Sequence, residues 1–282
     1  MPFVGYKTML VEAKSRNSCV AAFNCYNFET IKTVINAGEQ LQAPVVVMLY
    51  PALASHIPFS AFAHIVRDLA DKSPCPVSIH LDHCDDADVI LAAVKAGFQS
   101  VIVDASRRGY EENVSLTRRV VKLIRPLGAD IEAELGFVGS GSIISDYMED
   151  TGYTDPALAK QFVEDTEIDC LAVAVGNAHG HYKTAPRLDI TRLREIDRLT
   201  GLPLALHGGS GIPDAQLAEA AKNGVAKANF GTDFMKAVFD AQKAYLNGDG
   251  QQNVFGLTKA GETGGGTYAE SRIRALGADH AG

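Results

Sequence analysis

The sequence lacks three features that would indicate particular classes of protein. It has no long uninterrupted apolar run, so we expect neither a membrane span nor a signal peptide at its start. It has no excess of basic residues: 26 lysines and arginines stand against 34 acidic residues, and the net charge of −8 argues against nucleic acids and acidic membranes as partners. Its five cysteines include no Cys-x-x-Cys pair, which argues against a disulfide framework and a cysteine-rich zinc site. These absences predict a globular protein of the reducing cytoplasm.

The chain has, instead, a regular alternation of short apolar runs and longer helical patterns. The predicted strands are Cys19–Phe23, Val45–Leu49, Val77–His80, Ser100–Val103, Asp130–Glu134, Cys170–Val175, Leu204–His207 and Ala226–Phe230. The predicted helices lie near Glu29–Gln42, Phe59–Asp71, Asp85–Ala96, Glu111–Leu127, Pro156–Thr166, Ile190–Thr200, Asp214–Asn223 and Thr232–Leu246. Eight strand–helix units without a break in composition predict an α/β fold, a single (β/α)8 TIM barrel over residues 1–282. A doubly wound open sheet is the alternative, but it would not require eight units.

Glycine and proline positions add detail to this prediction. Helix starts are indicated at Asp155-Pro156 and Pro213-Asp214, and helix ends at Gly38, Gly97 and Gly224. The Gly- and Ser-rich segment 136–153 predicts a mobile loop above the barrel mouth. The segment 247–266 predicts a flexible Gly-rich connector before a short last helix, Tyr268–Ala275.

Three predicted strands each deliver a histidine at their carboxyl end, where the active site of a barrel gathers. These histidines are His83, His179 and His207. Three imidazoles from separate strands, with one coordination position left open, are typical of a catalytic zinc site. Three unrelated polar histidines are the alternative. His80 lies deeper in the barrel, and we expect it to be structural or to support a ligand.

Carboxylates and a lysine accompany the histidines. Asp82 precedes a predicted ligand and is either the acid/base that moves a hydroxyl proton or only an orienting group. Asp104 and Glu134 would hydrogen-bond the ligand imidazoles or form a second metal position, and support of the imidazoles is the favoured role. Lys227, within the eighth strand, is interpreted as a neutralised interior lysine rather than a Schiff-base nucleophile.

Glycine-rich segments directly follow two of the histidines. These segments, 180–183 and 208–211, allow close backbone approach to an anion, and Lys183 and Ser210 add a charge and a donor. We therefore predict a phosphate site that includes Gly180 and Gly208, with plain flexible turns as the alternative.

These residues form part of a larger set of motifs that runs from about Phe3 to the last strand and helix. The set comprises Phe23-Asn24 with Asn27, His80–His83 with Asp85, Val103–Ser106, Glu132–Gly136, His179-Gly180, His207–Gly211, Asn229 and Thr232-Asp233. Together they resemble the class II, zinc-dependent ketose-bisphosphate aldolases, the family of fructose- and tagatose-bisphosphate aldolases.

The resemblance implies a (β/α)8 barrel, zinc on His83, His179 and His207, and Asp82 as the catalytic acid/base. For dihydroxyacetone phosphate it implies a phosphate site formed by Gly180, Lys183, Gly208, Ser210, Asn229 and Thr232. It also implies a monovalent cation, Na+ or K+, and a homodimer or homotetramer acting on a phosphosugar.

The sequence departs from the family pattern where a second, distal phosphate would bind. Met235 replaces an expected arginine or lysine, Tyr50 a serine, and Gly231 an aspartate, while Arg107 and Arg108 stand where a histidine and a neutral residue are expected. The residues that could contact the distal group are therefore Asn24, Tyr50, Arg107, Arg108 and Met235. The family's loop glutamate aligns within Gly141, Ser142 and Ile143, so its replacement would come from Asp146, Glu149 or Asp150.

The sequence therefore predicts a zinc-dependent aldolase that cleaves or forms the C3–C4 bond of a ketose 1-phosphate, with altered distal specificity. An ordinary fructose- or tagatose-1,6-bisphosphate aldolase is one alternative. A weakly active paralogue that stabilises a true aldolase is another, favoured by the missing loop glutamate. A zinc hydrolase would not need the phosphate-type loops.

Overall fold

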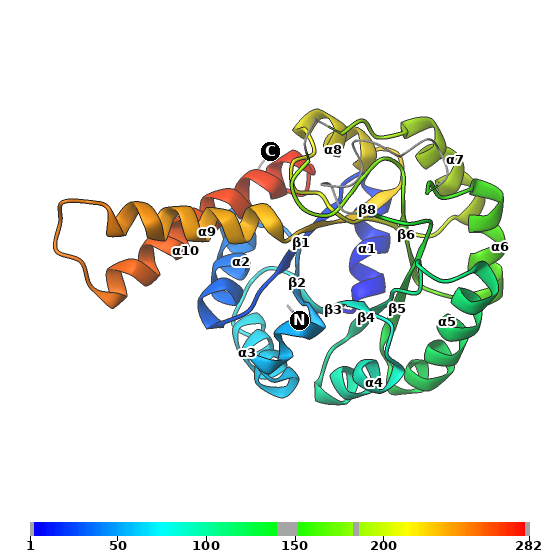
Figure 1. Ribbon diagram of the computed structural model, residues 1–282, viewed down its shortest axis with the longest axis horizontal. Coiled ribbons are helices and arrows are strands. Elements are labelled where there is room, and N and C mark those ends of the chain that lie inside the picture. The colour runs from blue at the N-terminus through cyan, green and yellow to red at the C-terminus, as the bar shows by residue number, and fades with distance from the viewer. Residues whose placement is uncertain (1–2, 140–151, 183–185, 280–282) are drawn as a thin grey trace.

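A closed barrel of eight parallel strands forms the centre of the computed structural model, which describes residues 3–139, 152–182 and 186–279 (Figure 1). Each strand pairs with the next, and the last pairs with the first. The strands are β1 (Val20–Asn24), β2 (Val45–Leu49), β3 (Val77–Cys84), β4 (Ser100–Val103), β5 (Asp130–Leu135), β6 (Cys170–Val173), β7 (Leu204–Leu206) and β8 (Val225–Phe230). The predicted barrel is confirmed and the open sheet is excluded, since the first and last strands are hydrogen-bonded neighbours.

Helices surround the barrel (Figure 1). They are α2 (Phe28–Leu41), α3 (Phe59–Ala70), α4 (Ala87–Ala96), α5 (Tyr110–Ile124), α6 (Pro156–Thr166), α7 (Ile190–Thr200), α8 (Asp214–Ala221) and α9 (Thr232–Leu246), with short 3-10 helices η1 (Pro51–Ser55) and η2 (Arg125–Leu127). Asp155 caps α6 by accepting from the Leu158 N–H, as its position before Pro156 predicted. Gly97 ends α4 in the left-handed conformation, as predicted.

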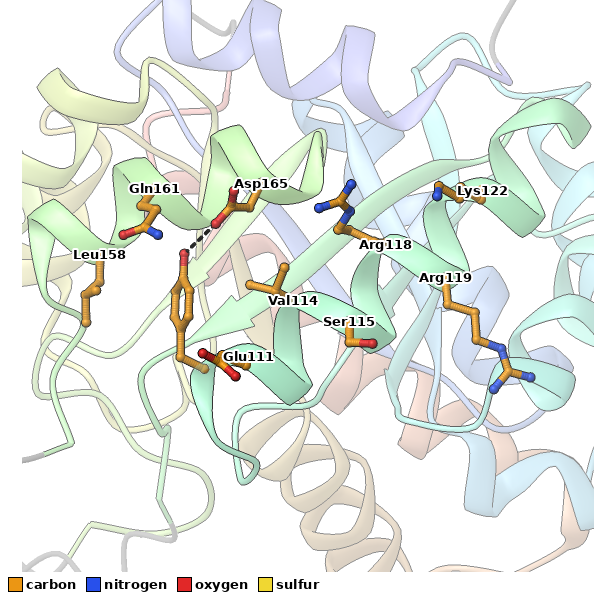
Figure 2. A pocket seen from close by; sticks show the side chains of 10 residues that line it. Glu111, Val114, Ser115, Arg118, Arg119, Lys122, Leu158, Gln161 and Asp165 are labelled. Atoms are coloured by element: carbon orange, nitrogen blue, oxygen red, sulfur yellow. Dashed lines mark hydrogen bonds between the residues drawn. The ribbon is translucent and has the colours of Figure 1, made fainter.

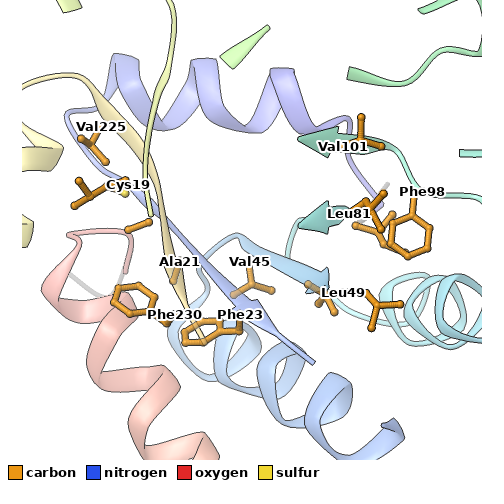
Figure 3. Close-up of a cluster of buried hydrophobic side chains, with 14 of the residues drawn as sticks. Cys19, Ala21, Phe23, Val45, Leu49, Leu81, Phe98, Val101, Val225 and Phe230 are labelled. Atoms are coloured by element: carbon orange, nitrogen blue, oxygen red, sulfur yellow. The ribbon is translucent and has the colours of Figure 1, made fainter. Parts of the chain in front are cut away.

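The strand side chains alternate between two apolar cores. Outward-facing residues such as Ala21 and Phe23 pack against the helices, and Figure 3 shows part of this outer core, in which the rings of Phe23 and Phe230 lie 5.6 Å apart. Inward-facing residues such as Val20 and Ala22 fill the barrel itself. Because strand side chains alternate with a period of two, His80 and Asp82 of β3 share the inward face.

A helix that the sequence analysis did not predict covers the amino ends of the strands. This helix, α1 (Tyr6–Ser15), buries Tyr6, Met9, Leu10 and Ala13 against the inner core. Just before it, the N–H of Val4 donates to the carbonyl of Val77 at the start of β3. The buried positions follow the i, i+3, i+4, i+7 spacing of an amphipathic helix, so the signal was present in the sequence.

The predicted flexible connector is wrong for residues 254–266. They belong to α10 (Val254–Ala275), a 22-residue helix that packs along α9 and forms with it a hairpin projecting from the barrel (Figure 1). A Cβ atom added to Gly264 would lie 2.5 Å from Ala241 Cβ and 2.7 Å from the Ala237 carbonyl oxygen of α9. The glycines therefore permit close helix packing, and tertiary contact overrides their poor helix propensity.

The prediction of a helix end at Gly38 is also wrong. Gly38 lies within α2, where an added Cβ would be 2.9 Å from the Ala43 carbonyl oxygen, and α2 ends at Leu41 with Gln42 left-handed. Close approach of the following chain, rather than a turn, explains this glycine.

Among the described residues, no helix combines the length and apolar character needed to cross a membrane.

Candidate active site

The three predicted histidines converge at the carboxyl ends of the strands. His83 Nε2 lies 3.1 Å from His179 Nε2 and 2.8 Å from His207 Nδ1. A tetrahedral zinc ion, with Zn–N bonds of about 2.0–2.1 Å, separates its nitrogen ligands by roughly 3.3 Å. The spacing of the three imidazoles therefore fits one metal ion.

The backbone of β3 is adjusted to present His83. The register between β3 and β4 shifts between Leu81 and Cys84, and His83 adopts a positive φ of 31°. An L-residue with a side chain rarely adopts this conformation. The irregularity extends β3 four residues beyond its predicted end and turns His83 toward the other two histidines.

The remaining ring nitrogen of each histidine has an acceptor. His83 Nδ1 lies 2.7 Å from Asp104 Oδ2, His179 Nδ1 3.2 Å from the Val138 carbonyl oxygen, and His207 Nε2 2.7 Å from Glu132 Oε1. Such partners fix the tautomer and the orientation of a metal-binding imidazole. Asp104 occupies the place predicted for it. Glu132 rather than Glu134 is the hydrogen-bond partner of His207, and Glu134 Oε2 lies 4.0 Å from His207 Nδ1.

Glu134 lies beside the three histidines without joining an imidazole by a hydrogen bond. Its Oε1 accepts from the Val138 N–H at 3.2 Å. Its buried Oε2 has no hydrogen-bond partner among the described residues and lies 4.0 Å from His207 Nδ1. Burial, and then Asp104, raise the pKa of Glu134 to about 8. Ligand atoms of His83, Asp104 and Glu134 lie within 4.8 Å of one another, so the geometry also suits the predicted second metal position.

Three carboxyl groups act on His83. Burial alone would lower the pKa of His83, but Asp82, Asp104 and Glu134 raise it to about 9. Burial and the other two imidazoles lower the pKa of His179 to about 4. The carboxylates thus stabilise one positive charge among the histidines, a charge that a metal cation can supply.

Asp82 is buried next to this group. Asn24 Nδ2 donates to its Oδ2 at 2.9 Å, Asn229 Nδ2 donates to its Oδ1 at 3.3 Å, and His83 Nε2 lies 3.9 Å from Oδ1. Burial raises the pKa of Asp82, but His83, His207 and Lys227 outweigh burial and bring the pKa to about 2. Asp82 is therefore an ionised carboxylate held by two amides.

The two glycine-rich segments meet above the histidines and are held in place. An added Cβ on Gly208, whose φ is 63°, would overlap the carbonyl of Ala178, two residues before the first segment, so the close approach at this point requires a glycine. Tyr182 joins them, since its hydroxyl accepts from the Ala178 N–H and donates to the Gly208 carbonyl. Gly180, with a φ of 83°, has open space around its α-carbon. Lys183 lies outside the described residues.

The amino end of α9 adjoins these segments. Ser210 Oγ accepts from the Asp233 N–H at 3.2 Å, and Thr232 is the first residue of the helix. Helix amino ends favour anions. Asn229 was also expected at the phosphate, and its side-chain amide nitrogen donates to Asp82.

Comparison with known proteins decides the family. The family model described as fructose-bisphosphate aldolase class-II matches residues 4–281. The chain belongs to this family. It is therefore an aldolase, a carbon–carbon lyase, and the family is generally zinc-dependent.

Individual relatives agree with this family assignment. The aldolase is 37% identical over 232 residues to a protein of Escherichia coli K12 named "Uncharacterized protein YdjI", with 82% of this chain and 84% of the relative covered. The crystal structure of the YdjI aldolase from E. coli K12 has a TM-score of 0.89 and 32% identity, and the match covers 99% and 98% of the two chains. A fructose-bisphosphate aldolase from Campylobacter jejuni, at 22% identity, has a TM-score of 0.83 over 98% and 95% and shares the fold.

The residues predicted for the distal group do not form one cluster of free polar groups. Asn24 contacts Asp82, and Arg108 pairs with Asp85 at 3.0 Å. The Arg107 guanidinium lies 5.5 Å from the centre of the Phe137 ring. Tyr50 is 44% exposed beside η1, and Met235 is half-buried in the first turn of α9. Residues 141–143 and the candidate loop acids Asp146, Glu149 and Asp150 lie outside the described residues.

One large groove in the described part of the aldolase lies away from the barrel mouth. It has a volume of about 970 Å³ and lies between α5 and α6 on the outer surface (Figure 2). In this groove the Tyr110 hydroxyl donates to Asp165 Oδ2 at 3.1 Å, and Figure 2 labels Asp165. The groove contains none of the site residues described above, so its size does not locate the chemistry.

Glu132 and Tyr6 had no predicted role. Lys227 is fully buried and ion-paired with Glu132, at 2.9 and 3.1 Å from its two oxygens, which agrees with a neutralised interior lysine. The period-two alternation places both Glu132 and Glu134 inside the barrel, but it does not say which of them reaches His207.

Proposed function

We propose that this aldolase cleaves and forms the C3–C4 bond of a ketose 1-phosphate, yielding dihydroxyacetone phosphate and an aldehyde that lacks the usual distal phosphate. The observation that carries the proposal is the ionised Asp82 carboxylate beside three converging imidazoles. His83, His179 and His207 would hold one zinc ion. Zinc bound there supplies Lewis acidity, which stabilises the negative charge left on the dihydroxyacetone-phosphate portion when the bond breaks.

Asp82 is the proposed acid/base. As a carboxylate it accepts the proton of the C4 hydroxyl during cleavage and returns it during synthesis. Asn24 and Asn229 keep it oriented, and their own Oδ1 atoms are buried without partners among the described residues. These two oxygens are suited to accept hydrogen bonds from substrate hydroxyls.

The proposed phosphate site comprises the two glycine-rich segments and the amino end of α9. Gly180, Gly208, Ser210 and Thr232 supply close backbone approach and donors, and Lys183 would supply a charge. The fixed contact between the segments through Tyr182 supports a preorganised site rather than plain turns.

Altered distal specificity is supported by the side chains that replace the family's second phosphate site. Tyr50 and Met235 supply no cation, and Arg108 is paired with Asp85. A phosphate placed there without charge-assisted donors would not recover its lost hydration. A neutral group at C6, or a different anion approached by Arg107, is therefore favoured.

A panel of ketose 1-phosphates that differ at C6 tests the proposal. We expect kcat/KM for a 6-deoxy or 6-hydroxy substrate to exceed that for fructose 1,6-bisphosphate and tagatose 1,6-bisphosphate at least tenfold. Bisphosphates that win by tenfold would identify an ordinary bisphosphate aldolase. Absence of turnover with every substrate, in protein loaded with zinc, would favour a stabilising subunit.

A further inference from the structure

A buried polar chain connects α1, at the closed end of the barrel, with the metal ligand His207. Tyr6, Glu132, Lys227 and His207 are all 0% exposed. The Tyr6 hydroxyl donates to Glu132 Oε2, and Glu132 Oε1 lies 2.7 Å from His207 Nε2. One carboxylate therefore joins the amino-terminal helix to the proposed metal site.

Lys227 does not by itself determine the orientation of the Glu132 carboxylate. Its ammonium group lies 3.1 Å from Oε1 and 2.9 Å from Oε2, so it neutralises the charge of Glu132 without distinguishing the two oxygens. An ammonium group acts as a compact charge with rotatable donors. The Tyr6 hydroxyl contacts Oε2 and leaves Oε1 to His207.

The phenol ring of Tyr6 is itself firmly held. It stacks on the His80 ring, with centroids 5.0 Å apart and an interplanar angle of 19°, and His80 Nδ1 lies 2.8 Å from Ser100 Oγ. The next residue, Lys7, donates its backbone N–H to Asp130 Oδ2 at 2.8 Å. Burial, followed by Cys170 and Glu132, raises the pKa of Tyr6 well above its ordinary value, so the hydroxyl remains a donor.

We propose that Tyr6 is a positioning residue for zinc binding: together with Lys227 it fixes Glu132 so that Oε1 accepts from His207 Nε2. His207 then keeps its proton on Nε2 and directs the Nδ1 lone pair toward the metal. This inference rests on the proposed role of His207 as a ligand. It makes the docking of α1 at one end of the barrel a determinant of metal affinity at the other.

Zinc affinity of Tyr6→Phe tests the inference, because phenylalanine keeps the ring and its stacking and removes only the hydroxyl. Metal-free protein is titrated with zinc in competition with a chelator. We expect the zinc Kd to rise about 3- to 10-fold, less than the 10- to 100-fold expected for Glu132→Gln, which alters the direct partner of the ligand. Tyr110→Phe is the matched control, since it removes a tyrosine hydroxyl that donates to Asp165 in the groove between α5 and α6, which none of the three histidines lines.

The route through Glu132 is tested by the double variant Tyr6→Phe/Glu132→Gln. If Tyr6 acts through Glu132, the double variant has the zinc Kd of Glu132→Gln within twofold. Additive losses, or a Tyr6→Phe Kd within twofold of the wild-type value, would overturn the inference and leave Tyr6 as a filler of the barrel end. An equal loss in Tyr110→Phe would also overturn it.

Two further variants keep the outcome decisive. Tyr6→Met fills the same space flexibly without a hydroxyl and replaces Tyr6→Phe if circular dichroism shows that the latter is unfolded. His207→Ala separates this inference from the proposed function. If His207→Ala retains full zinc affinity, the ligand assignment itself fails. If it loses affinity while Tyr6→Phe does not, only the role of Tyr6 fails.

Discussion

At the scale of single residues, neighbouring carboxylates of the site make different contacts and have different proposed roles. Asp104 and Glu132 each face the outer nitrogen of an imidazole, whereas Asp82 is held by the amides of Asn24 and Asn229. Asp82 is thus oriented by neutral donors, which leave its charge uncompensated by any direct salt bridge to lysine or arginine among the described residues. Because His83, His207 and Lys227 lower its pKa to about 2, Asp82 is ionised at neutral pH, which is the form that can accept a proton.

The first prediction follows for Asp82→Asn, which keeps the shape of the side chain and cannot act as a base. We expect kcat for aldol cleavage to fall roughly 10²- to 10⁴-fold, the usual contribution of a positioned acid/base. Bound zinc should remain near the wild-type level because the imidazoles are unchanged. Steady-state kinetics and metal analysis of the same preparation check both outcomes, and a near-normal kcat would reduce Asp82 to an orienting residue.

At the scale of elements, the α9–α10 hairpin depends on glycines that serve packing rather than flexibility. Two glycines of α10 differ in what a methyl group would meet. At Gly264 an added Cβ lies 2.5 Å from Ala241 Cβ, whereas at Gly266 its only neighbour within 4 Å is Thr33 Cγ2 at 3.8 Å. The same substitution should therefore have opposite effects at these two positions.

We expect Gly266→Ala to raise the free energy of unfolding by up to about 1 kcal/mol, because alanine is the better helix former. We expect Gly264→Ala to lower it by about 1–3 kcal/mol, because α9 and α10 must separate to admit the methyl group. Urea unfolding at fixed pH and zinc concentration measures both. Changes of the same sign in the two variants would show that packing against α9 does not govern α10.

At the scale of the whole molecule, the sequence predicts the elements that follow a repeating pattern. It does not predict features that depend on contacts between distant parts of the chain. Alternating patterns located all eight strands, and the strand ends located the histidines. The choice of Glu132 rather than Glu134 as the partner of His207 depends on the registers of β5, β6 and β7 around the barrel, which no local pattern encodes. The helical state of residues 254–266 depends on contact with α9 and was hidden by the composition of the segment.

The last prediction concerns the stability that a bound metal ion would add to the barrel. His83 is the penultimate residue of β3, while His179 and His207 follow β6 and β7, so one ion would join three separate parts of the barrel wall. A ligand at 1,000 times its Kd that binds only the folded state adds about 4 kcal/mol to stability. For a chain of 282 residues this corresponds to a rise in Tm of roughly 5–10 °C. Zinc should produce this rise in the wild type, with about one ion per chain, and little or no rise in His179→Ala. An equal rise in both proteins would place the stabilising zinc elsewhere and contradict the three-histidine site.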